Sequence, residues 1–534
     1  MTMIDASSKY QDFISTRNLI RPGHPAVYQL RTKKEEFGSL TRMTVGKKDV
    51  NKINKTILLV GETGTGKSTL INALVNYSMG VKWEDGVWFQ IVEEKEEKRS
   101  QTESQTSDVM MYQMFGFEGK TLPYSLTIID TPGFGDSRGI KQDDIISQRL
   151  LEWFRSDDGV QEINAVGLVV KWTENRLSDR LMYVFNSVTS LFGKNMEKNI
   201  VALITHSDGR NPKNALQALE AANIKCSRDE ENQPVYFLFN NCQHEHRTEE
   251  EEESLKADYK ISQRGMKQFT LFLEKTGPQK LKTTIKVLNE RIRLTACIQN
   301  LQDRISLTEL KQTEIRQIQE ALKKHEGEMK ENQNFTVEVD EVYKEKEDID
   351  GGRWGLMFYK AAVTCTVCEE NCHYPGCTMA RKPEHCEVIK KGRCTVCTRK
   401  CPASDHVKEK RRYVTKTRKV QKTMVDMEEK YVHSKTESQS KSTLLENLGE
   451  EIKKLTAERS QLLDEAYHHV VKLEEIALNA DSVSTYVHLD FLIEKMKEEG
   501  DKEKVQKLEK MKSREDEGSR PAVQYVEHFR GKIK

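Results

Sequence analysis

The sequence predicts an α/β domain with a mostly parallel sheet and helices on both faces, followed by a long helical region that carries a small cysteine-rich module. Three observations support this fold class. Short apolar runs alternate with helix-length segments up to about residue 275, charged helix-forming segments follow, and eight cysteines gather between residues 365 and 401. Apolar runs spaced in this way are typical of parallel strands joined by helices.

Length and composition set the outer limits. At 534 residues the chain is too long for one core, and about 150 residues per domain gives roughly three units. Charged residues make up 32% and aromatic residues 7%, which is typical of long solvated helices. Because 85 lysines and arginines balance 84 aspartates and glutamates, we expect no nucleic-acid partner. No stretch reaches the roughly 18 apolar residues of a membrane span, and the first residues lack the features of a signal peptide, so we expect a cytoplasmic protein without a transmembrane segment.

The order of these features predicts six regions. The strands of the α/β domain are expected at TILLVG, YSLTIID, AVGLVVK, NIVALIT and VYFLF. The regions are an N-terminal extension (1–50), the α/β domain (51–275), a helical arm (276–334), a cysteine-rich module on a charged β-ribbon (335–422), a returning coiled-coil arm (423–480) and a charged helical tail (481–534).

The two arms show helical periodicity. Residues that step by three and four place one seam along the second arm, and they are Leu445, Leu448, Ile452, Leu455, Arg459, Leu462, Ala466, His469, Leu473 and Ile476. A similar pattern with slips runs through residues 285–322. We therefore expect an antiparallel coiled-coil hairpin with the cysteine insert at its tip. Two ordinary amphipathic helices packed on the α/β domain are the alternative.

The flanks of the cysteine insert carry opposite charges. FTVEVDEVYKEKEDID holds seven acids and two bases, and VKEKRRYVTKTRKVQK holds one acid and eight bases, which gives −5 against +7. Both alternate β-branched or aromatic residues with charge, so antiparallel pairing would bring opposite charges together. Two solvated charge runs, or a basic arm for nucleic acid, are the alternatives.

A phosphate-binding loop follows the first apolar run. GETGTGKST spans residues 61–69 and fits the pattern Gly-x4-Gly-Lys-Ser between a strand and a helix. In this motif backbone N–H groups surround the phosphates, Lys67 reaches the outer phosphates and Ser68 supplies a magnesium ligand. The expected phosphate-binding residues are Gly61, Glu62, Thr63, Gly64, Thr65, Gly66, Lys67, Ser68 and Thr69.

The next strand ends in a magnesium and switch motif. In LTIIDTPGFGD, Asp130 closes the strand and Gly133 follows three residues later. The carboxylate can hold Mg²⁺ through water, and the glycine amide can sense the γ-phosphate. Upstream, Thr106 is the threonine expected to close on Mg²⁺, with Thr102 as the alternative. The expected catalytic residues are thus Lys67, Thr106 and Gly133, and the expected magnesium ligands are Ser68, Thr106 and Asp130.

Base specificity is expected from NIVALITHSDG, which places Thr205, His206 and Asp208 at the end of a strand. A carboxylate at Asp208 can accept both N1–H and N2–H of guanine, a pairing that adenine cannot offer, so the predicted nucleotide is GTP or GDP. His206 stands where lysine is usual and could stack on the base. The alternative is a strand-end turn capped by Asp208. Asn240 and Asn241, after VYFLF, are expected at the other edge of the base.

These segments resemble those of a known branch of P-loop GTPases. TIIDTPGFGD is similar to the corresponding segment of septins, the asparagine pair resembles that of the immunity-associated GTPases of the GIMAP type in the paraseptin branch, and His206 resembles the residue of the chloroplast protein-import GTPases. The resemblance covers about residues 51–275, and teleost proteins that join this domain to a cysteine-bearing helical region look similar to the whole chain. It implies a GTPase that forms a homodimer or a higher assembly through its G domain.

One residue departs from the usual switch motif. Phe134 follows DTPG, where many switch GTPases place the glutamine that orients the attacking water. We therefore expect slow GTP hydrolysis that rises only when a second protomer or a partner supplies a polar group. Arg138 is the candidate for that group in this chain.

The cysteine insert predicts metal binding. Two Cys-x2-Cys-x3-Cys runs and two further cysteines supply eight thiols, enough for two tetrahedral structural zinc ions, and they are Cys365, Cys368, Cys372, Cys377, Cys386, Cys394, Cys397 and Cys401. His373, His385 and His406 lie alongside, and the spacing leaves the pairing of ligands open. The alternative is a free-thiol cluster. Cys226, Cys242 and Cys297 are scattered and are expected to serve packing.

Together these features predict a GTP-switched assembly protein whose zinc-stabilised helical arm is presented to an unknown protein partner. One alternative is a mechanical ATPase with coiled arms and a zinc hook, although nothing beyond residue 480 resembles the second ATPase half that such machines need. Another is a scaffold in which the nucleotide is purely structural, and which predicts no effect of GTP on self-association.

Overall fold

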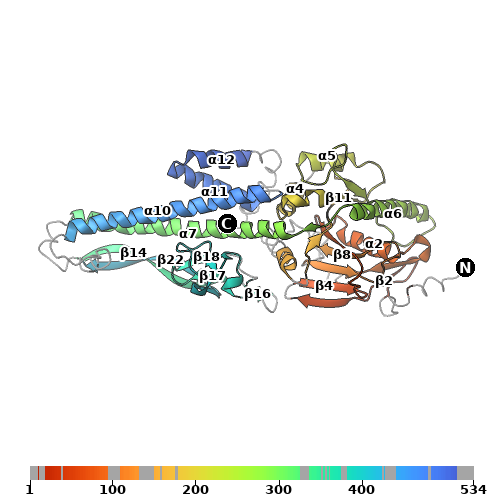
Figure 1. Cartoon of the computed structure of the whole chain (residues 1–534), viewed down its shortest axis with the longest axis horizontal. Helices are drawn as coiled ribbons and strands as arrows, with labels where there is room; N and C mark the ends of the chain where they lie inside the picture. The colour runs from red at the N-terminus through yellow and green to blue at the C-terminus, as the bar shows by residue number, and fades with distance from the viewer. Residues whose placement is uncertain are drawn as a thin grey trace. The chain divides into compact units, whose positions relative to one another are not determined.

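The computed structural model describes residues 10, 19–37, 40–93, 109–131, 149–156, 159–174, 179–324, 336–349, 353–354, 358–359, 361–374, 380, 382–423, 426, 440–478 and 483–513. The chain divides into two compact units (Figure 1). The first unit comprises residues 1–288, 474–486 and 511–534, and the second comprises residues 289–473 and 487–510. Helix α7 (Lys282–Lys324) begins in the first unit and continues in the second.

The first unit is built on an eight-stranded mixed sheet. Its strands, in spatial order, are β12 (Tyr236–Leu238), β11 (Ile200–Thr205), β10 (Ala165–Lys171), β5 (Asn54–Val60), β8 (Ser125–Asp130), β7 (Met110–Met114), β4 (Leu40–Val45) and β3 (Lys33–Phe37). Pairing is parallel from β12 to β8 and between β7 and β4, and it is antiparallel between β8 and β7 and between β4 and β3. The α/β fold expected from the sequence is therefore present, as a mixed sheet.

The five strands expected from the sequence are the five parallel neighbours from β12 to β8. Strands β7, β4 and β3 extend the sheet and were not expected. Two of them come from the segment that was interpreted as an N-terminal extension. Strand β3, with the sequence KKEEF, is an edge strand and carries charge instead of an apolar run, which is why it shows no strand pattern.

Both faces of this sheet are buried. Along β5, Ile57 and Leu59 lie on one face and Leu58 and Val60 on the other, and all four side chains are fully buried. Each such aliphatic side chain contributes about 1.5–3 kcal/mol on burial. The residues of the first face share a core with helices α2 and α6. The helices of the unit are α2 (Lys67–Met79), α4 (Asp179–Thr189), α5 (Lys213–Ala221) and α6 (Glu252–Lys275).

Shorter elements complete the first unit. A small sheet consists of β1 (Leu19–Arg21), β2 (Ala26–Gln29) and β6 (Val87–Gln90), and a second ladder joins β9 (Glu162–Ile163) to β13 (Gln279–Lys280). The 3-10 helices are η2 (Trp83–Asp85) and η3 (Lys194–Asn199).

The second unit contains an antiparallel pair of long helices, α7 and α10 (Ser440–Ile476) (Figure 1). Glu290 bonds His469 at 2.9 Å, and the thiol of Cys297 lies 4.0 Å from the carbonyl oxygen of Leu462. A step of seven residues along α7 thus matches a step of seven back along α10. Of the seam residues, those most buried are Leu455, Leu462, Ala466 and Leu473. Coiled-coil geometry remains a prediction.

Two further helices, α11 (Val483–Glu499) and α12 (Lys502–Ser513), contact α10 within the second unit. Ser460 donates to the Glu499 carboxylate at 2.7 Å, and Lys504 pairs with Asp464 at 2.7 Å. No helix among the described residues is long and apolar enough to cross a bilayer.

A two-stranded ribbon connects α7 to the cysteine-rich segment. Strands β14 (Thr336–Asp348) and β22 (Arg411–Thr423) pair antiparallel along their full length, as their opposite charges suggested. Glu341 and Arg418 are register partners and form an ion pair at 2.8 Å. On α7, the Gln317 amide exchanges two hydrogen bonds with Asp340 of the ribbon.

The cysteine-rich segment packs beside α7, whereas the sequence suggested that it would lie at the tip of the helical hairpin. Asn300 and Arg304 of α7 contact Glu370 of the module, although α7 continues to Lys324. The reason is the ribbon, because strands of thirteen residues span about 40 Å and lead the chain back along the helix.

The module itself is a three-stranded sheet with small additions. The sheet has the order β18 (Glu370–His373), β17 (Ala362–Cys365) and β21 (His406–Glu409), and β19 (Ile389–Lys390) forms a hairpin with β20 (Arg393–Cys394). The remaining elements are β15 (Arg353–Trp354), β16 (Phe358–Tyr359), η4 (Pro383–His385) and η5 (Ala403–Asp405).

Candidate nucleotide site and candidate metal centre

The phosphate-binding loop lies between the end of β5 and the start of α2. Gly64 and Gly66 have φ values of +81° and +86°, a region that residues with a Cβ rarely adopt. A Cβ on Gly61 would lie 2.6 Å from the carbonyl oxygen of Val169, so the loop also needs glycine for close packing. These constraints explain the glycine spacing of the motif in terms of the local backbone.

The first turn of α2 is open to an anion. Gly66 precedes the helix without a side-chain cap, and the first turn contains no acidic residue. Its first N–H groups and the positive end of the helix dipole therefore face the loop. The Lys67 ammonium lies across this loop and donates to the carbonyl oxygens of Gly61 and Glu62 at 2.9 and 2.8 Å. Phosphate oxygens could replace these two carbonyl contacts.

Two oxygen donors stand beside the loop. Asp130 ends β8 directly next to Leu59 of β5 and is fully buried. Ser68 lies in the first turn of α2 and is half-buried. A carboxylate and a hydroxyl are the hard ligands that Mg²⁺ takes, together with phosphate oxygens. Burial, with smaller contributions from the Asp130 and Glu93 charges, holds the pKa of Tyr112 well above its usual range.

Strand β11 connects the phosphate loop to the expected base-binding loop. The Thr205 hydroxyl is buried and donates to the carbonyl oxygen of Thr65 at 2.7 Å. His206 has a φ of +53°, and its Nδ1 lies 3.1 Å from the Thr205 hydroxyl. Burial, with a smaller contribution from Lys171, lowers the pKa of His206, so its imidazole is neutral at pH 7. A neutral ring beside Gly66 is compatible with stacking on a base.

Asp208 presents an exposed carboxylate two residues beyond His206. Its Oδ1 accepts a hydrogen bond from the Arg210 N–H at 2.9 Å, which orients the side chain and leaves Oδ2 facing solvent, 3.8 Å from the Arg210 guanidinium. Ser207 is buried and donates its N–H to the carbonyl oxygen of Phe239. The loop that carries Asp208 is therefore held in place while its carboxylate is accessible.

The asparagine pair is tied to helix α6. The Asn240 amide donates to Asp258 at 2.7 Å, and the Asn241 side-chain oxygen accepts from the Ser262 hydroxyl at 2.9 Å. The same hydroxyl bonds the Asn240 carbonyl oxygen at 2.8 Å. Both side chains therefore anchor the loop after β12, and a contact with a base would have to come from its backbone or follow a rearrangement.

The structure thus gathers most of the predicted nucleotide residues at the carboxyl ends of neighbouring parallel strands, where ligands of open α/β sheets bind. These residues are those of the loop 61–69, Asp130, Thr205 and His206, with Asp208 on the following loop. Thr102, Thr106, Gly133, Phe134 and Arg138 lie outside the described residues.

The cysteines of the second unit form two knuckles. In the first, the Cys368 N–H donates to the Cys365 sulfur at 3.3 Å. In the second, the Cys397 N–H donates to the Cys394 sulfur at 3.4 Å, and the Cys401 N–H donates to the Cys397 sulfur at 3.3 Å. N–H groups directed at sulfur favour the thiolate, which is the metal-binding form. With Cys372, which completes the first Cys-x2-Cys-x3-Cys run, six of the eight predicted thiols lie in the segments 365–372 and 394–401 that contain these knuckles.

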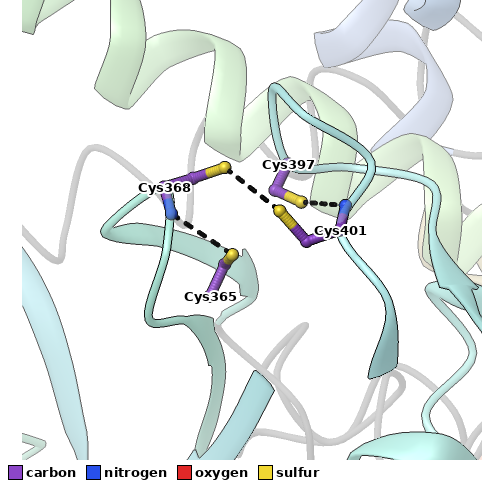
Figure 2. A group of neighbouring side chains, drawn as sticks. All are labelled: Cys365, Cys368, Cys397 and Cys401. Carbon is purple, nitrogen blue, oxygen red and sulfur yellow. Dashed lines mark hydrogen bonds between the residues drawn. The ribbon is translucent and has the colours of Figure 1, made fainter. Parts of the chain in front are cut away.

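Side chains from the two knuckles converge in two groups whose ligand atoms all lie within 4.8 Å of one another. One group contains Cys365, Cys368, Cys397 and Cys401, and the other contains Cys372, Cys394, Cys397 and His406. Figure 2 shows the first group, in which the sulfurs of Cys368 and Cys401 are 3.6 Å apart. Four soft ligands at such distances suit a tetrahedral ion such as zinc.

Burial and close contacts between sulfur atoms shift the pKa values of several residues in these groups. Burial raises the pKa of Cys365 to about 12. Hydrogen bonds from Cys372 and Cys394 hold the pKa of Cys397 far below its usual range. Burial lowers the pKa of His406, but hydrogen bonds to Cys394 and Cys397 outweigh it and raise the value to about 10. A bound cation would favour the thiolate form of these cysteines, because metal ligands must be deprotonated.

A third buried group stands apart from these two. His373 Nδ1 lies 3.1 Å from the Cys386 sulfur and 3.6 Å from the Glu387 carboxylate. Cys386 therefore does not share a group with the knuckle cysteines, although the sequence could not separate them. Cys377 lies outside the described residues. His373, Glu387 and His406 were not among the predicted ligands; the sequence showed His373 and His406 beside the cysteines, and nothing in it indicated Glu387.

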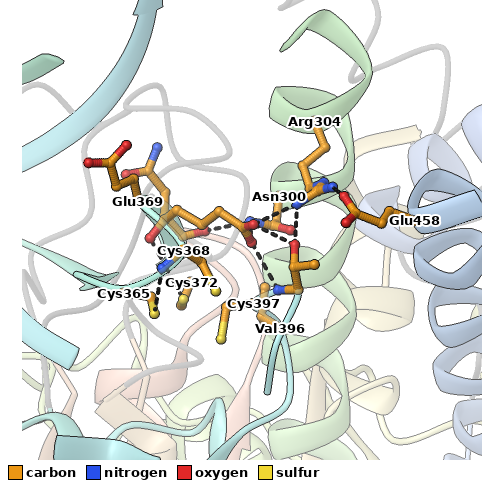
Figure 3. A network of polar contacts seen from close by, with 12 residues as sticks. Asn300, Arg304, Cys365, Cys368, Glu369, Cys372, Val396, Cys397 and Glu458 are labelled. Atoms are coloured by element: carbon orange, nitrogen blue, oxygen red, sulfur yellow. Dashed lines mark hydrogen bonds and ion pairs between the residues drawn. The ribbon is translucent and has the colours of Figure 1, made fainter. Parts of the chain in front are cut away.

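A buried polar network holds both knuckles against the helices (Figure 3). The Glu370 carboxylate accepts hydrogen bonds from Asn300 at 3.2 Å, from Arg304 at 2.6 Å and from the Thr398 N–H at 3.1 Å. Arg304 also pairs with Glu458 of α10. One guanidinium therefore connects the first knuckle, the second knuckle and both long helices.

Comparisons with known proteins agree with this geometry. The fold and the loop define the first unit as an α/β domain of the P-loop GTPase class. Within that class, residues 51–155 match the family model described as Septin. Septin-5 of Homo sapiens is 30% identical over 129 residues, which cover 22% of this chain and 31% of that protein, and Septin-5 of Macaca fascicularis gives 30% identity over 129 residues. The chain thus spans about a third of the length of these curated relatives.

Among solved structures, Toc33 from Arabidopsis thaliana in complex with Mg²⁺ and GMPPNP is 16% identical, covers 43% of this chain and 88% of its own, and has a TM-score of 0.29. The complex of Toc33 with GDP and Mg²⁺ is also 16% identical, covers 42% of this chain and 84% of its own, and has a TM-score of 0.28.

Proposed function

We propose that the chain binds GTP and hydrolyses it slowly, that GTP promotes self-association through the G domain, and that a zinc-stabilised module on the helical arm is presented for assembly or partner binding. The observation that carries the proposal is the loop between β5 and α2. An uncapped helix start, glycines in the left-handed region and a lysine held over the loop form a site for a nucleotide phosphate.

Different residues are proposed to contact the phosphates and the magnesium ion. Backbone N–H groups of residues 61–69 donate to the phosphates, and Lys67 exchanges its carbonyl contacts for outer phosphate oxygens. Ser68 and Asp130 would hold Mg²⁺, which neutralises charge on the β- and γ-phosphates. Thr106 and Gly133 are proposed to close on the metal and the γ-phosphate in the triphosphate state.

Guanine is the base that the exposed carboxylate supports. Asp208 accepts two N–H groups in this proposal, His206 stacks on the ring as a neutral imidazole, and the Thr205 hydroxyl keeps the base loop in contact with the phosphate loop. The two ends of the proposed nucleotide site are thus linked by a buried hydrogen bond.

Slow turnover and self-association follow from the resemblance and from Phe134. With no glutamine after DTPG, a second protomer is proposed to supply the missing polar group. Turnover per chain should therefore rise with protein concentration, and a fast rate that stays constant on dilution would contradict this part of the proposal.

Calorimetric titration tests the central claim. The full chain, with magnesium, is titrated with a non-hydrolysable GTP analogue and separately with the matching ATP analogue. Tight binding of the GTP analogue alone supports the proposal. Binding of ATP alone, or equal binding of both, contradicts it and favours the mechanical ATPase. GTP binding without any effect on self-association favours the scaffold.

A further inference from the structure

We propose that Cys397 bridges two metal ions in one binuclear centre. This inference rests on the zinc module proposed above and adds which residues hold each ion. The first ion would be bound by Cys365, Cys368, Cys401 and Cys397, and the second by Cys372, Cys394, His406 and the same Cys397.

The distances support a shared sulfur. Cys397 belongs to both groups, and in each group all ligand atoms lie within 4.8 Å of one another. Two ligands of a tetrahedral zinc ion with bonds of about 2.3 Å are separated by about 3.8 Å, and the sulfurs of Cys368 and Cys401 are 3.6 Å apart. Two four-coordinate ions need eight positions, and seven residues fill them when one thiolate serves twice.

His406 has the surroundings of a metal ligand. It is buried, and its Nδ1–H donates to the carbonyl oxygen of Pro402 at 2.9 Å. The other ring nitrogen, Nε2, is buried too, and His406 lies in one group with Cys372, Cys394 and Cys397, whose ligand atoms are all within 4.8 Å of one another. A backbone acceptor on one nitrogen, with the second nitrogen directed at the other ligands, is the arrangement that orients histidine toward a metal.

The sheet brings ligands of both ions together. Cys365 at the end of β17 and His406 at the start of β21 are register partners in an antiparallel pair. Directly opposed residues in such a pair place their side chains on the same side of the sheet. The two ions are therefore bound over the same strands, with the second knuckle closing over them through Cys397.

The net charge also favours a centre with six thiolates and one histidine over a centre with eight thiolates. Two Zn²⁺ ions with eight thiolates carry a formal charge of +4 − 8 = −4, whereas six thiolates and a neutral His406 leave +4 − 6 = −2. Buried charge is costly unless it is paired or hydrogen-bonded. The N–H donors to the sulfurs of Cys365, Cys394 and Cys397 disperse the remainder.

The test uses cadmium as a probe. The full chain is loaded with ¹¹³Cd, and its NMR spectrum is recorded. A bridging thiolate predicts two resonances, one from an ion with four sulfur ligands and one from an ion with three sulfur ligands and one nitrogen ligand, split by scalar coupling to each other. His406→Ala should shift or remove the resonance of the ion with the nitrogen ligand, and its removal should also abolish the splitting of the other resonance. Cys386→Ala, the control for a thiol outside both groups, should leave the coupled pair unchanged.

The outcomes distinguish the proposed bridging role of Cys397 from metal binding by the module as a whole. Two uncoupled resonances, or two ions that each have four sulfur ligands, would overturn the bridge while the metal module stands. A chain that binds no metal under reducing conditions would remove the module as well, and GTP binding measured on the same sample would show whether the nucleotide proposal survives. The coupling is measured on the wild-type chain, so the test of the bridge does not require a Cys397 variant that folds. An additional resonance from a metal ion in the His373 group would not change whether the other two resonances are coupled.

Discussion

Replacement of Asp208 by asparagine should exchange guanine for xanthine specificity. Asparagine keeps the side-chain oxygen that accepts the Arg210 N–H at 2.9 Å, so the loop should retain its conformation. It replaces the second acceptor by an NH₂ donor, which would face the N2–H of guanine. Xanthine has a carbonyl oxygen at that position, so the amide could donate to it.

The size of the effect follows from one lost charge-assisted hydrogen bond and one unfavourable pair of donors. A hydrogen bond to a charged group contributes about 1.5–3 kcal/mol, and an unsatisfied donor costs a similar amount. Because Asp208 is exposed, with 46% of its side chain accessible, water competes, and we expect about 2–3 kcal/mol. This corresponds to a roughly 30- to 150-fold weaker Kd for GTP.

The assay is calorimetric titration of the full-length variant with GTP and xanthosine triphosphate analogues. Asp229→Asn is a matched control, because Asp229 is also exposed and accepts backbone N–H bonds from Glu231 and Gln233. An Asp208→Asn chain that binds GTP as tightly as the parent, without gaining affinity for xanthosine triphosphate, would refute the assignment of Asp208 to the base.

Three further predictions concern stability and thiol chemistry. Arg304→Met should destabilise the second unit by about 3–5 kcal/mol in urea unfolding, because it leaves the Glu370 charge buried without its partner; an unchanged midpoint would contradict this. Burial raises the pKa of Cys226 to about 11 and of Cys297 to about 12, so alkylation followed by mass spectrometry at pH 8 should leave both thiols unmodified until the chain unfolds. Acidification should release metal cooperatively, because protons compete with the metal for the thiolates. A metal-binding dye should detect the released metal, and titration of the same sample should show unchanged GTP binding.

The pH dependence at His206 has a defined sign. Its folded pKa is lowered by burial below the usual value, so its neutral form is favoured in the folded chain. The associated stability is present above the unfolded pKa of about 6.5 and is lost as the pH falls below it. His206→Gln should therefore reduce the acid sensitivity of the first unit in thermal unfolding, and an identical pH profile would contradict the effect.

The sequence predicts local features of the nucleotide site well because each depends on neighbouring residues. Gly64 and Gly66 are needed by the backbone of one loop, and Asp130 and Thr205 each end an apolar strand. Parallel strands carry their ligands at one sheet edge, so their order along the chain is enough to bring these residues together. Charged strand β3 lacks such a pattern.

The metal groups were less predictable because they depend on contacts between distant segments. Two similar runs of three thiols and two further cysteines are visible in the sequence, but their division between groups depends on the register of β17 with β21 and on the packing of the second knuckle. A single histidine has no pattern of its own, and His406 becomes a candidate ligand only when β21 places it opposite Cys365. The position of the module beside α7 depends on the ribbon register in the same way.

The network around Arg304 joins the cysteine-rich module to the helical arm. Glu370 lies between Cys368 and Cys372 in the first knuckle, and its carboxylate accepts the Thr398 N–H, one residue after Cys397 in the second. Both knuckles therefore contact the network, and Arg304 connects it to Glu458 on α10. Loss of metal would release both knuckles and disturb the ion pair between Arg304 and Glu370. These charges would then be buried without well-placed partners, which costs free energy. Metal occupancy should consequently raise the stability of the α7–α10 pair as well as that of the module.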